Sequence, residues 1–172
     1  SASKVGREVI QLLKPFNVTV LVYDPYLSDW EAGHLGVEKV GLNELFATSD
    51  FVTVHAPSIP ATNKLIGAEQ LKLLRDGATL VNTSRGTVID HDALLAEART
   101  GRILVTLDVT TPEPLPADSP FRQLPNVFIT PHISGTGYYG YFKIGEMTLA
   151  ALEDFFADKP VRGAVNLGRF DQ

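Results

Sequence analysis

Residues 1–26 read SASKVGREVIQLLKPFNVTVLVYDPY, and this stretch decides the fold. Its apolar residues between positions 5 and 13 recur at the i, i+4, i+7 and i+8 spacing of one helix face, and Pro15 and Asn17 end the pattern. Residues 18–23 are apolar and β-branched, which predicts a buried strand, and Asp24-Pro25 stops it. A helix followed by a strand that ends in an acidic residue is half of a dinucleotide-binding unit.

The turn before this helix departs from the usual G-x-G-x-x-G pattern. If Gly6 is its third glycine, Ser1 and Ser3 occupy the first two positions, and alone this is no better than a chance glycine at a helix start. Asp24 supports the match, because it lies 18 residues beyond Gly6 and about 20 are expected for the acid that binds the adenine ribose. A carboxylate there repels a 2′-phosphate and favours NAD over NADP; the alternative is an ordinary strand-to-turn stop.

Helices and strands alternate along the rest of the chain. After a polar loop we expect helices at 42–47, 67–74, 90–100 and 138–157, and strands at 51–54, 79–82, 104–109 and 127–130. Asp90 caps the third of these helices and Gly101 ends it. With residues 18–23 the pattern predicts an α/β fold, a Rossmann-like doubly wound parallel sheet of five strands with helices on both faces.

Residues with useful chemistry follow the predicted strands, at the edge where such sheets bind ligands. Arg85 lies in a loop of small residues and can grip a carboxylate with two parallel hydrogen bonds. Glu113 lies in a proline-rich loop, and His132 follows the last strand. Each has an ordinary alternative: a surface arginine paired with an acid, a solvated carboxylate, a structural histidine. Their convergence at one sheet edge would be a stronger signal.

Composition excludes several classes of function. The net charge is −5 and the 15 basic residues are scattered, which argues against nucleic acid or an anionic membrane as partner. The absence of cysteine excludes thiol catalysis, disulfides and thiolate metal sites, and fits a cytoplasmic protein. No apolar run approaches the roughly 18 residues of a membrane span, and we expect neither a signal peptide nor a metal site.

Six stretches together carry a family resemblance: REVIQLLKPF with VYDPY, VHAPSIPATNKLI, GATLVNTSRGTVIDHDALLAEARTGRI, LDVTTPEPLP, NVFITPHISG, and GAVN near the end. With them the chain resembles the D-isomer-specific 2-hydroxyacid dehydrogenases, which reduce 2-oxo acids with NAD(P)H. The stretches cover nearly the whole chain, in order and at the family's spacing. LDVTTPEPLP is most similar to the glyoxylate/hydroxypyruvate reductase branch.

The resemblance implies a catalytic triad. Arg85 would bind the substrate carboxylate, His132 would be the acid/base, and Glu113 would orient the imidazole and favour its protonated form. His34, His55 and His91 are not candidates for the proton donor; His91 is expected to be solvated at a helix start, and His55 to shape a turn. The residues that the resemblance places at the NAD cofactor are Lys4, Val5, Asp24, Ala56, Pro57, Thr83, Ser84, Arg85, Asp108, His132, Ser134 and Gly135.

The chain also departs from the family. The first strand and the substrate domain of the family precede the glycine loop, so we expect residues 1–160 to be an NAD-binding domain without its first strand and 161–172 a return toward a substrate domain. We therefore expect either a portion of a longer chain or other residues that fill the position of the first strand. We also expect a small 2-oxo or 2-hydroxy acid as substrate and a homodimer as assembly. Tyr138, Tyr139 and Tyr141 are interpreted as core packing, with a cleft or dimer contact as the alternative.

Three functions follow from these observations. The first is an NAD-dependent 2-hydroxyacid dehydrogenase, with formate and phosphite dehydrogenases as variants on the same scaffold. The second is a non-catalytic NAD(H)-binding sensor or corepressor-like module, which the altered glycine loop favours. The third is a pseudo-enzyme with a structural or dimerisation role, which nicotinamide binding would separate from the other two.

Overall fold

The computed structural model describes residues 1–165, the side chain of Tyr138 excepted. The chain forms two compact units, Ser1–Pro131 and His132–Gln172. The predicted boundary between residues 160 and 161 separates a cofactor domain from a return segment, not one compact unit from another, and it stays a prediction. The part of the predicted return segment from Asn166 onward lies outside the described residues.

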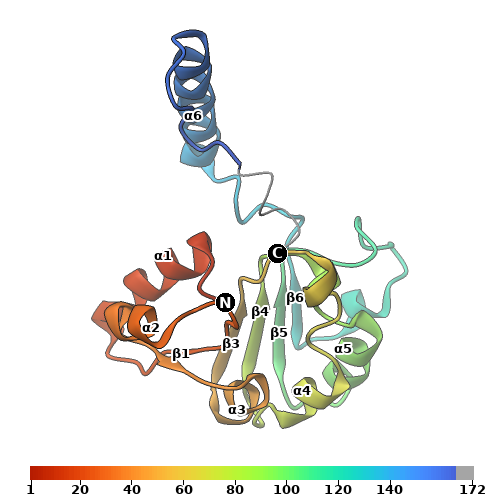
Figure 1. Cartoon of the computed structure of the whole chain (residues 1–172). Coiled ribbons are helices and arrows are strands. Elements are labelled where there is room, and N and C mark those ends of the chain that lie inside the picture. Colours follow the sequence, from red (N-terminus) through yellow and green to blue (C-terminus); the bar gives the residue numbers. More distant parts are fainter. Residues whose placement is uncertain (166–172) are drawn as a thin grey trace. The chain divides into compact units, whose positions relative to one another are not determined.

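The main sheet of the first unit has four parallel strands in chain order: β3 (Phe51–Val54), β4 (Thr79–Asn82), β5 (Leu104–Leu107) and β6 (Val127–Ile129). Figure 1 shows them side by side. Val52 is level with Leu80, Leu80 with Val105, and Val105 with Val127. The parallel α/β sheet expected from the sequence is therefore confirmed, with β3 and β4 at the predicted bounds.

Helices cover one face of this sheet. Inward residues of the strands form one hydrophobic core with α3 (Leu42–Thr48), α4 (Ala68–Leu73) and α5 (His91–Ala98). The other face carries Phe51, Leu104 and Phe128, which are 79%, 52% and 64% exposed in the first unit. Because side chains alternate along a strand, this burial pattern follows directly from the two-residue period.

A second, smaller sheet pairs β1 (Leu21–Val22) with β2 (Glu38–Lys39) in parallel. It shares a separate core with α1 (Lys4–Leu13) and α2 (Asp29–Leu35). The sequence prediction is wrong here in two respects. The strand expected at 18–23 has two residues and leaves Val18 54% exposed, and the expected polar loop contains both α2 and β2. There are thus six strands, not five, in the described part of the chain.

The two sheets do not join through β1 and β3. Among the described residues β1 pairs only with β2, and β3 only with β4. The doubly wound fold arranges its strands in the order 3-2-1-4-5-6. In that order β2 corresponds to strand 3, β1 to strand 2 and β3 to strand 4. The position that no described strand holds is that of the first strand, which the sequence predicts to be missing.

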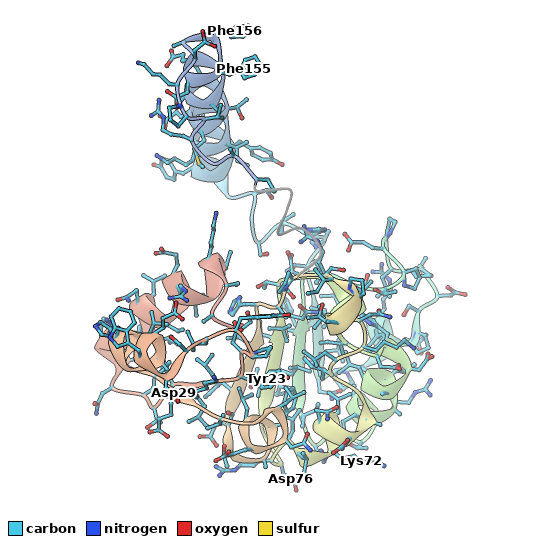
Figure 2. All side chains as sticks on the ribbon, viewed as in Figure 1. Tyr23, Asp29, Lys72, Asp76, Phe155 and Phe156 are labelled. Carbon is cyan, nitrogen blue, oxygen red and sulfur yellow. The ribbon has the colours of Figure 1, made fainter. Side chains whose placement is uncertain are left out.

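The second unit is built around α6 (Tyr138–Phe156), close to its predicted bounds. Its last two residues, Phe155 and Phe156, pack edge to face but stay 64% and 81% exposed (Figure 2). Tyr139 and Tyr141 are 82% and 65% exposed, so they belong to no core within the second unit, and their packing elsewhere stays a prediction. None of the helices in residues 1–165 combines the length and the apolar character that a membrane crossing requires.

Arg102 joins three segments of the first unit. Its Nε donates to Glu97 Oε1 at 2.6 Å, and its Nη2 donates to the carbonyls of Leu71 at 2.9 Å and Lys72 at 3.2 Å. Nη1 donates to the carbonyl of Leu74 and to the carboxylate of Asp76. Figure 2 labels Lys72 and Asp76 at this end of α4. The last carbonyls of a helix have no partner within it, and the guanidinium donates to two of them in α4, those of Leu71 and Lys72.

We predict that Arg102→Ala lowers the free energy of unfolding by about 3 kcal/mol, because Glu97 is left buried without its partner. Urea unfolding measures it. Arg75→Ala is the matched control: its pair with Asp50 is long, at 3.4 Å, and both side chains are more than half exposed, so the loss should stay under about 1 kcal/mol. Equal losses in the two variants would contradict the assignment.

Candidate functional site

Asp24 follows β1 and is tied to the loop that opens α1. Its Oδ2 accepts hydrogen bonds from the Ser1 hydroxyl at 3.0 Å and the Ala2 amide at 2.9 Å. Its Oδ1 accepts from the Tyr26 amide at 3.0 Å. The carboxylate is therefore fixed beside the start of the helix, which is the relation that a ribose-binding acid has to a pyrophosphate-binding loop.

Gly6 is required by packing. A methyl group at this position would overlap the carbonyl oxygen of Ser1 and lie 3.5 Å from Cβ of His55. This close approach of backbone to backbone is the constraint that the third glycine of a dinucleotide loop meets. A chance glycine at a helix start would show no such contact.

The two serines turn their hydroxyls toward their own chain. Ser3 caps α1, its Oγ accepting from the Gly6 amide at 3.2 Å, while the Ser1 hydroxyl is bound to Asp24. The amides of Lys4 and Val5, the first two residues of α1, find no acceptor within the described residues. Both residues are exposed. Unpaired amides at the start of a ten-residue helix, with its dipole, suit a pyrophosphate.

The loop after β4 is shaped by a buried amide. Asn82 has no exposed surface; its Nδ2 donates to the Arg85 carbonyl at 3.0 Å, and its Oδ1 accepts from both the amide and the hydroxyl of Ser84 at 3.0 Å. Thr83 and Ser84 are half-buried, whereas the Arg85 side chain is exposed, with Nη1 donating to the Ser84 carbonyl at 2.6 Å. No carboxylate forms an ion pair with Arg85 in residues 1–165.

The loop after β5 lies against the loop after β4. A methyl group at Gly86 would overlap the carbonyl of Thr110 and come within 2.5 Å of Thr111 Oγ1. Asp108 is 3% exposed, and its Oδ1 accepts from the Thr130 hydroxyl at 2.6 Å. Arg85 and Glu113 are thus carried by two loops in direct contact, and the exposed Glu113 lies two residues beyond Thr111.

His91 contradicts the expectation of a solvated side chain. It is half-buried, with Nδ1 donating to the Ile89 carbonyl at 3.1 Å and Nε2 accepting from the Thr111 amide at 3.2 Å. Phe121 packs edge to face on the ring, with centroids 5.9 Å apart. Burial lowers the pKa of His91, against the opposing effects of the Ile89 carbonyl and two neighbouring carboxylates. The loop after β5 folds over the ring, which the local sequence at the helix start does not indicate.

The residues after β3 are arranged more simply. His55 is half-buried with Nε2 3.0 Å from Thr53 Oγ1, and burial is the main cause that lowers its pKa. Ala56 is half-buried and Pro57 is exposed. Both follow the carboxyl end of β3, on the edge where the family resemblance predicts cofactor contacts.

His132, Ser134 and Gly135 lie at the start of the second unit. All three are exposed, and His132 has a φ of 56°, in the left-handed region that non-glycine residues rarely adopt. The structure therefore brings together the loops of Arg85 and Glu113 in the first unit. The convergence of His132 with them stays a prediction.

Three residues that shape this edge are absent from the sequence-based set: Asn82, Gly86 and His91. A signal existed for Asn82, because an Asn side chain at the end of a strand commonly binds the backbone amide two residues further on, in an Asx turn. Gly86 directly follows the candidate arginine, but its contact partner is 24 residues away. For His91 the partner, Thr111, is 20 residues distant, and no local pattern indicates it.

Comparison with known proteins agrees with these observations. Residues 1–134 match the sequence model of the family described as D-isomer specific 2-hydroxyacid dehydrogenase, NAD binding domain. A D-3-phosphoglycerate dehydrogenase of Archaeoglobus fulgidus is 36% identical over 165 residues, covering 95% of this chain and 31% of the relative. A glyoxylate reductase of Korarchaeum cryptofilum is 37% identical over 153 residues, covering 88% of this chain and 46% of the relative.

A solved structure is also similar. The D-isomer specific 2-hydroxyacid dehydrogenase of Xanthobacter autotrophicus, in complex with NADPH and MES, superposes with a TM-score of 0.83 at 30% identity, covering 98% of this chain and 69% of that one. The chain spans less than half the length of the two curated relatives above.

We predict that Gly86→Ala destabilises the protein by about 1–3 kcal/mol, because the added methyl group pushes the Thr110 backbone away. Gly33→Ala is the matched control, since nothing lies within 4 Å of its added methyl group and alanine favours the helix. Thermal unfolding of both variants measures the difference. A Gly86→Ala protein as stable as the control would show that the two loops are not held in contact.

Proposed function

We propose, since the chain belongs to the D-isomer-specific 2-hydroxyacid dehydrogenase family and is an NAD-binding domain of it, that the whole protein interconverts a small 2-oxo acid and its 2-hydroxy acid. The observation that carries this proposal is the contact between Gly86 and Thr110. It sets the loop of Arg85 against the loop of Glu113, two members of the triad that the sequence indicates.

The first unit fits a dinucleotide. The free amides of Lys4 and Val5 suit the pyrophosphate, and the fixed carboxylate of Asp24 suits the adenine ribose. Ala56, Pro57, Thr83 and Ser84 follow strand ends along the same edge. We place the nicotinamide near Asp108, at the end of β5, with Ser134 and Gly135 completing the site.

The three catalytic residues have distinct roles in this proposal. NADH, when bound, supplies the hydride that reduces the carbonyl carbon of the oxo acid. Arg85 binds the carboxylate with two hydrogen bonds and fixes the carbonyl for attack. His132 donates its proton to the carbonyl oxygen as negative charge develops there. Glu113 orients the imidazole and stabilises its cationic form by charge attraction.

We also propose how the rest of the protein completes the site. A strand between β1 and β3 would satisfy the unpaired edges of both, and a substrate domain would supply the other wall of the substrate site. Residues 1–160 would then be the cofactor domain and 161–172 its return segment. By family likeness we propose a cytoplasmic homodimer.

We predict that His132→Ala in the full-length protein lowers kcat about 10²- to 10⁴-fold in NADH oxidation with 2-oxo acids, because the general acid is lost. The KM for NADH should change little. Loss of NADH absorbance measures it with glyoxylate, hydroxypyruvate, pyruvate and longer 2-oxo acids. In the reverse direction, with NAD and D-3-phosphoglycerate, the gain of NADH absorbance measures it. NADH binding without turnover of any acid would favour the non-catalytic sensor instead.

We predict that Asp24→Asn shifts cofactor preference toward NADPH by about tenfold or more, because it removes a carboxylate that repels the 2′-phosphate. The asparagine oxygen can still accept from the Ala2 amide. The ratio of kcat/KM for NADH and NADPH measures the change. Asp29→Asn is the control: it removes the same charge five residues away, from a side chain that is 96% exposed. A similar shift in both variants would mean that only net charge matters.

A further inference from the structure

His91 lies under the loop that carries Glu113. Its Nε2 accepts a hydrogen bond from the Thr111 amide at 3.2 Å, and Glu113 is two residues further along the loop. The imidazole is itself fixed, because Nδ1 donates to the Ile89 carbonyl at 3.1 Å and Phe121 packs against the ring. The part of the loop that precedes Glu113 is therefore held by a hydrogen bond to Nε2 of His91.

The second side of the loop is anchored by Arg122. Its Nη2 donates to the Leu115 carbonyl at 2.8 Å and its Nε to the Pro116 carbonyl at 3.0 Å. Leu115 is buried in the main core. Glu113 thus lies between two anchors, and only the one at His91 can change its protonation in the physiological range.

The bond from Thr111 fixes the tautomer of His91. Nδ1 faces a carbonyl, which only accepts, so it must carry the hydrogen. Nε2 faces an N–H group, which only donates, so it must carry a lone pair. A protonated imidazole has a hydrogen on both nitrogens, and its Nε2–H would oppose the Thr111 N–H.

The charged groups around His91 act in both directions. Asp90 and Asp92 flank it on α5 and favour its protonated form, as does the Ile89 carbonyl, but burial outweighs them and lowers the pKa of His91. Lys64 pairs with Asp90 at 3.0 Å and offsets part of that carboxylate. The other charged groups on the packed segments are Glu97 on α5, Glu113 and Asp118 on the loop, and Arg122 beside Phe121.

We propose that His91 is a positioning residue for the acid–base pair: its neutral imidazole holds the Glu113 loop in place, and protonation of the imidazole releases the loop. This inference rests on the proposed function, because it acts through Glu113. The lowered pKa of His91 agrees with this proposal, because it favours the neutral imidazole that accepts from Thr111. Because the fold favours the neutral imidazole, the contribution of His91 to the free energy of unfolding is fully present above the ordinary histidine pKa of about 6.5. This contribution is lost as the pH falls through the lower pKa that His91 has in the folded protein.

The first experiment measures the hydrogen bond between Thr111 and His91 independently of catalytic activity. Hydrogen–deuterium exchange is followed in the full-length protein for a peptide spanning 109–116, in which three prolines leave few amides besides that of Thr111. After correction for intrinsic rates, wild type should exchange about tenfold faster at pH 5 than at pH 7.5. His91→Gln, which accepts through its amide oxygen and does not titrate, should lose this pH dependence. His91→Asn, too short to reach Thr111, should exchange fast at both pH values.

The second experiment reads the consequence for catalysis. His91→Asn should lower kcat roughly 3- to 30-fold at neutral pH with little change in the KM for NADH, because a displaced Glu113 acts mainly in the reaction step. In wild type kcat should fall on the acid side, and this fall should be absent in His91→Gln. His34→Gln is the matched control, the same substitution at an exposed histidine on α2 whose Nδ1 also faces a carbonyl; it should behave as wild type.

The outcomes separate the two proposals. Equal exchange of the 109–116 peptide in wild type and both His91 variants, at both pH values, overturns the anchor. An unchanged acid limb in His91→Gln overturns its role in positioning Glu113. If the wild type shows no turnover with any acid, the proposed function fails, and the exchange data still decide whether His91 holds the loop.

Discussion

The site depends on one steric constraint, the contact between the backbone at Gly86 and the carbonyl of Thr110. The ends of β4 and β5 are in register, with Asn82 level with Leu107, so the loops that follow must share the same edge. They can meet at backbone distance only where one of them has no side chain. Glycine directly after the candidate arginine therefore does more than permit a turn: it sets how close Arg85 comes to the neighbouring loop.

Hydrogen bonds of buried polar side chains hold these two loops in the positions that the contact between Gly86 and Thr110 allows. Asn82 binds the Arg85 loop through three hydrogen bonds, and Asp108 accepts from the Thr130 hydroxyl. A buried polar group without a partner costs about 1–3 kcal/mol, yet within the described residues no buried side-chain N or O atom lacks a partner. The same bonds that make these residues tolerable in the core hold the loops at the sheet edge, so fold stability and site geometry are not independent here.

The sequence predicted what local physics decides. Strands β3 and β4 match their predicted bounds, and Asp90 caps α5 as expected, its carboxylate accepting from the Asp92 and Ala93 amides. The helix α2 was missed although Ser28 and Glu31 form a capping box at its start, because only Ala32 and Leu35 form its buried face. Trp30, its largest apolar residue, is 70% exposed. Residues 18–20 and 23 were overpredicted, because a β-branched and apolar run indicates a strand but not a neighbour to pair with. The contact of His91 with Thr111 depends on tertiary packing alone.

The two halves of the proposed site rest on two separate cores. Asp24 and the start of α1 belong with the small core, whereas Arg85, Asp108 and Glu113 depend on the main one. Near the glycine loop the halves approach each other where Gly6 faces Cβ of His55. Cofactor affinity and chemistry should therefore respond to different substitutions. Loosening the small core displaces the residues proposed to contact the ribose and pyrophosphate, and loosening the main core displaces the residues proposed to act on the substrate. A strand paired to both β1 and β3 would couple the two, because it would fix the distance between Asp24 and Arg85.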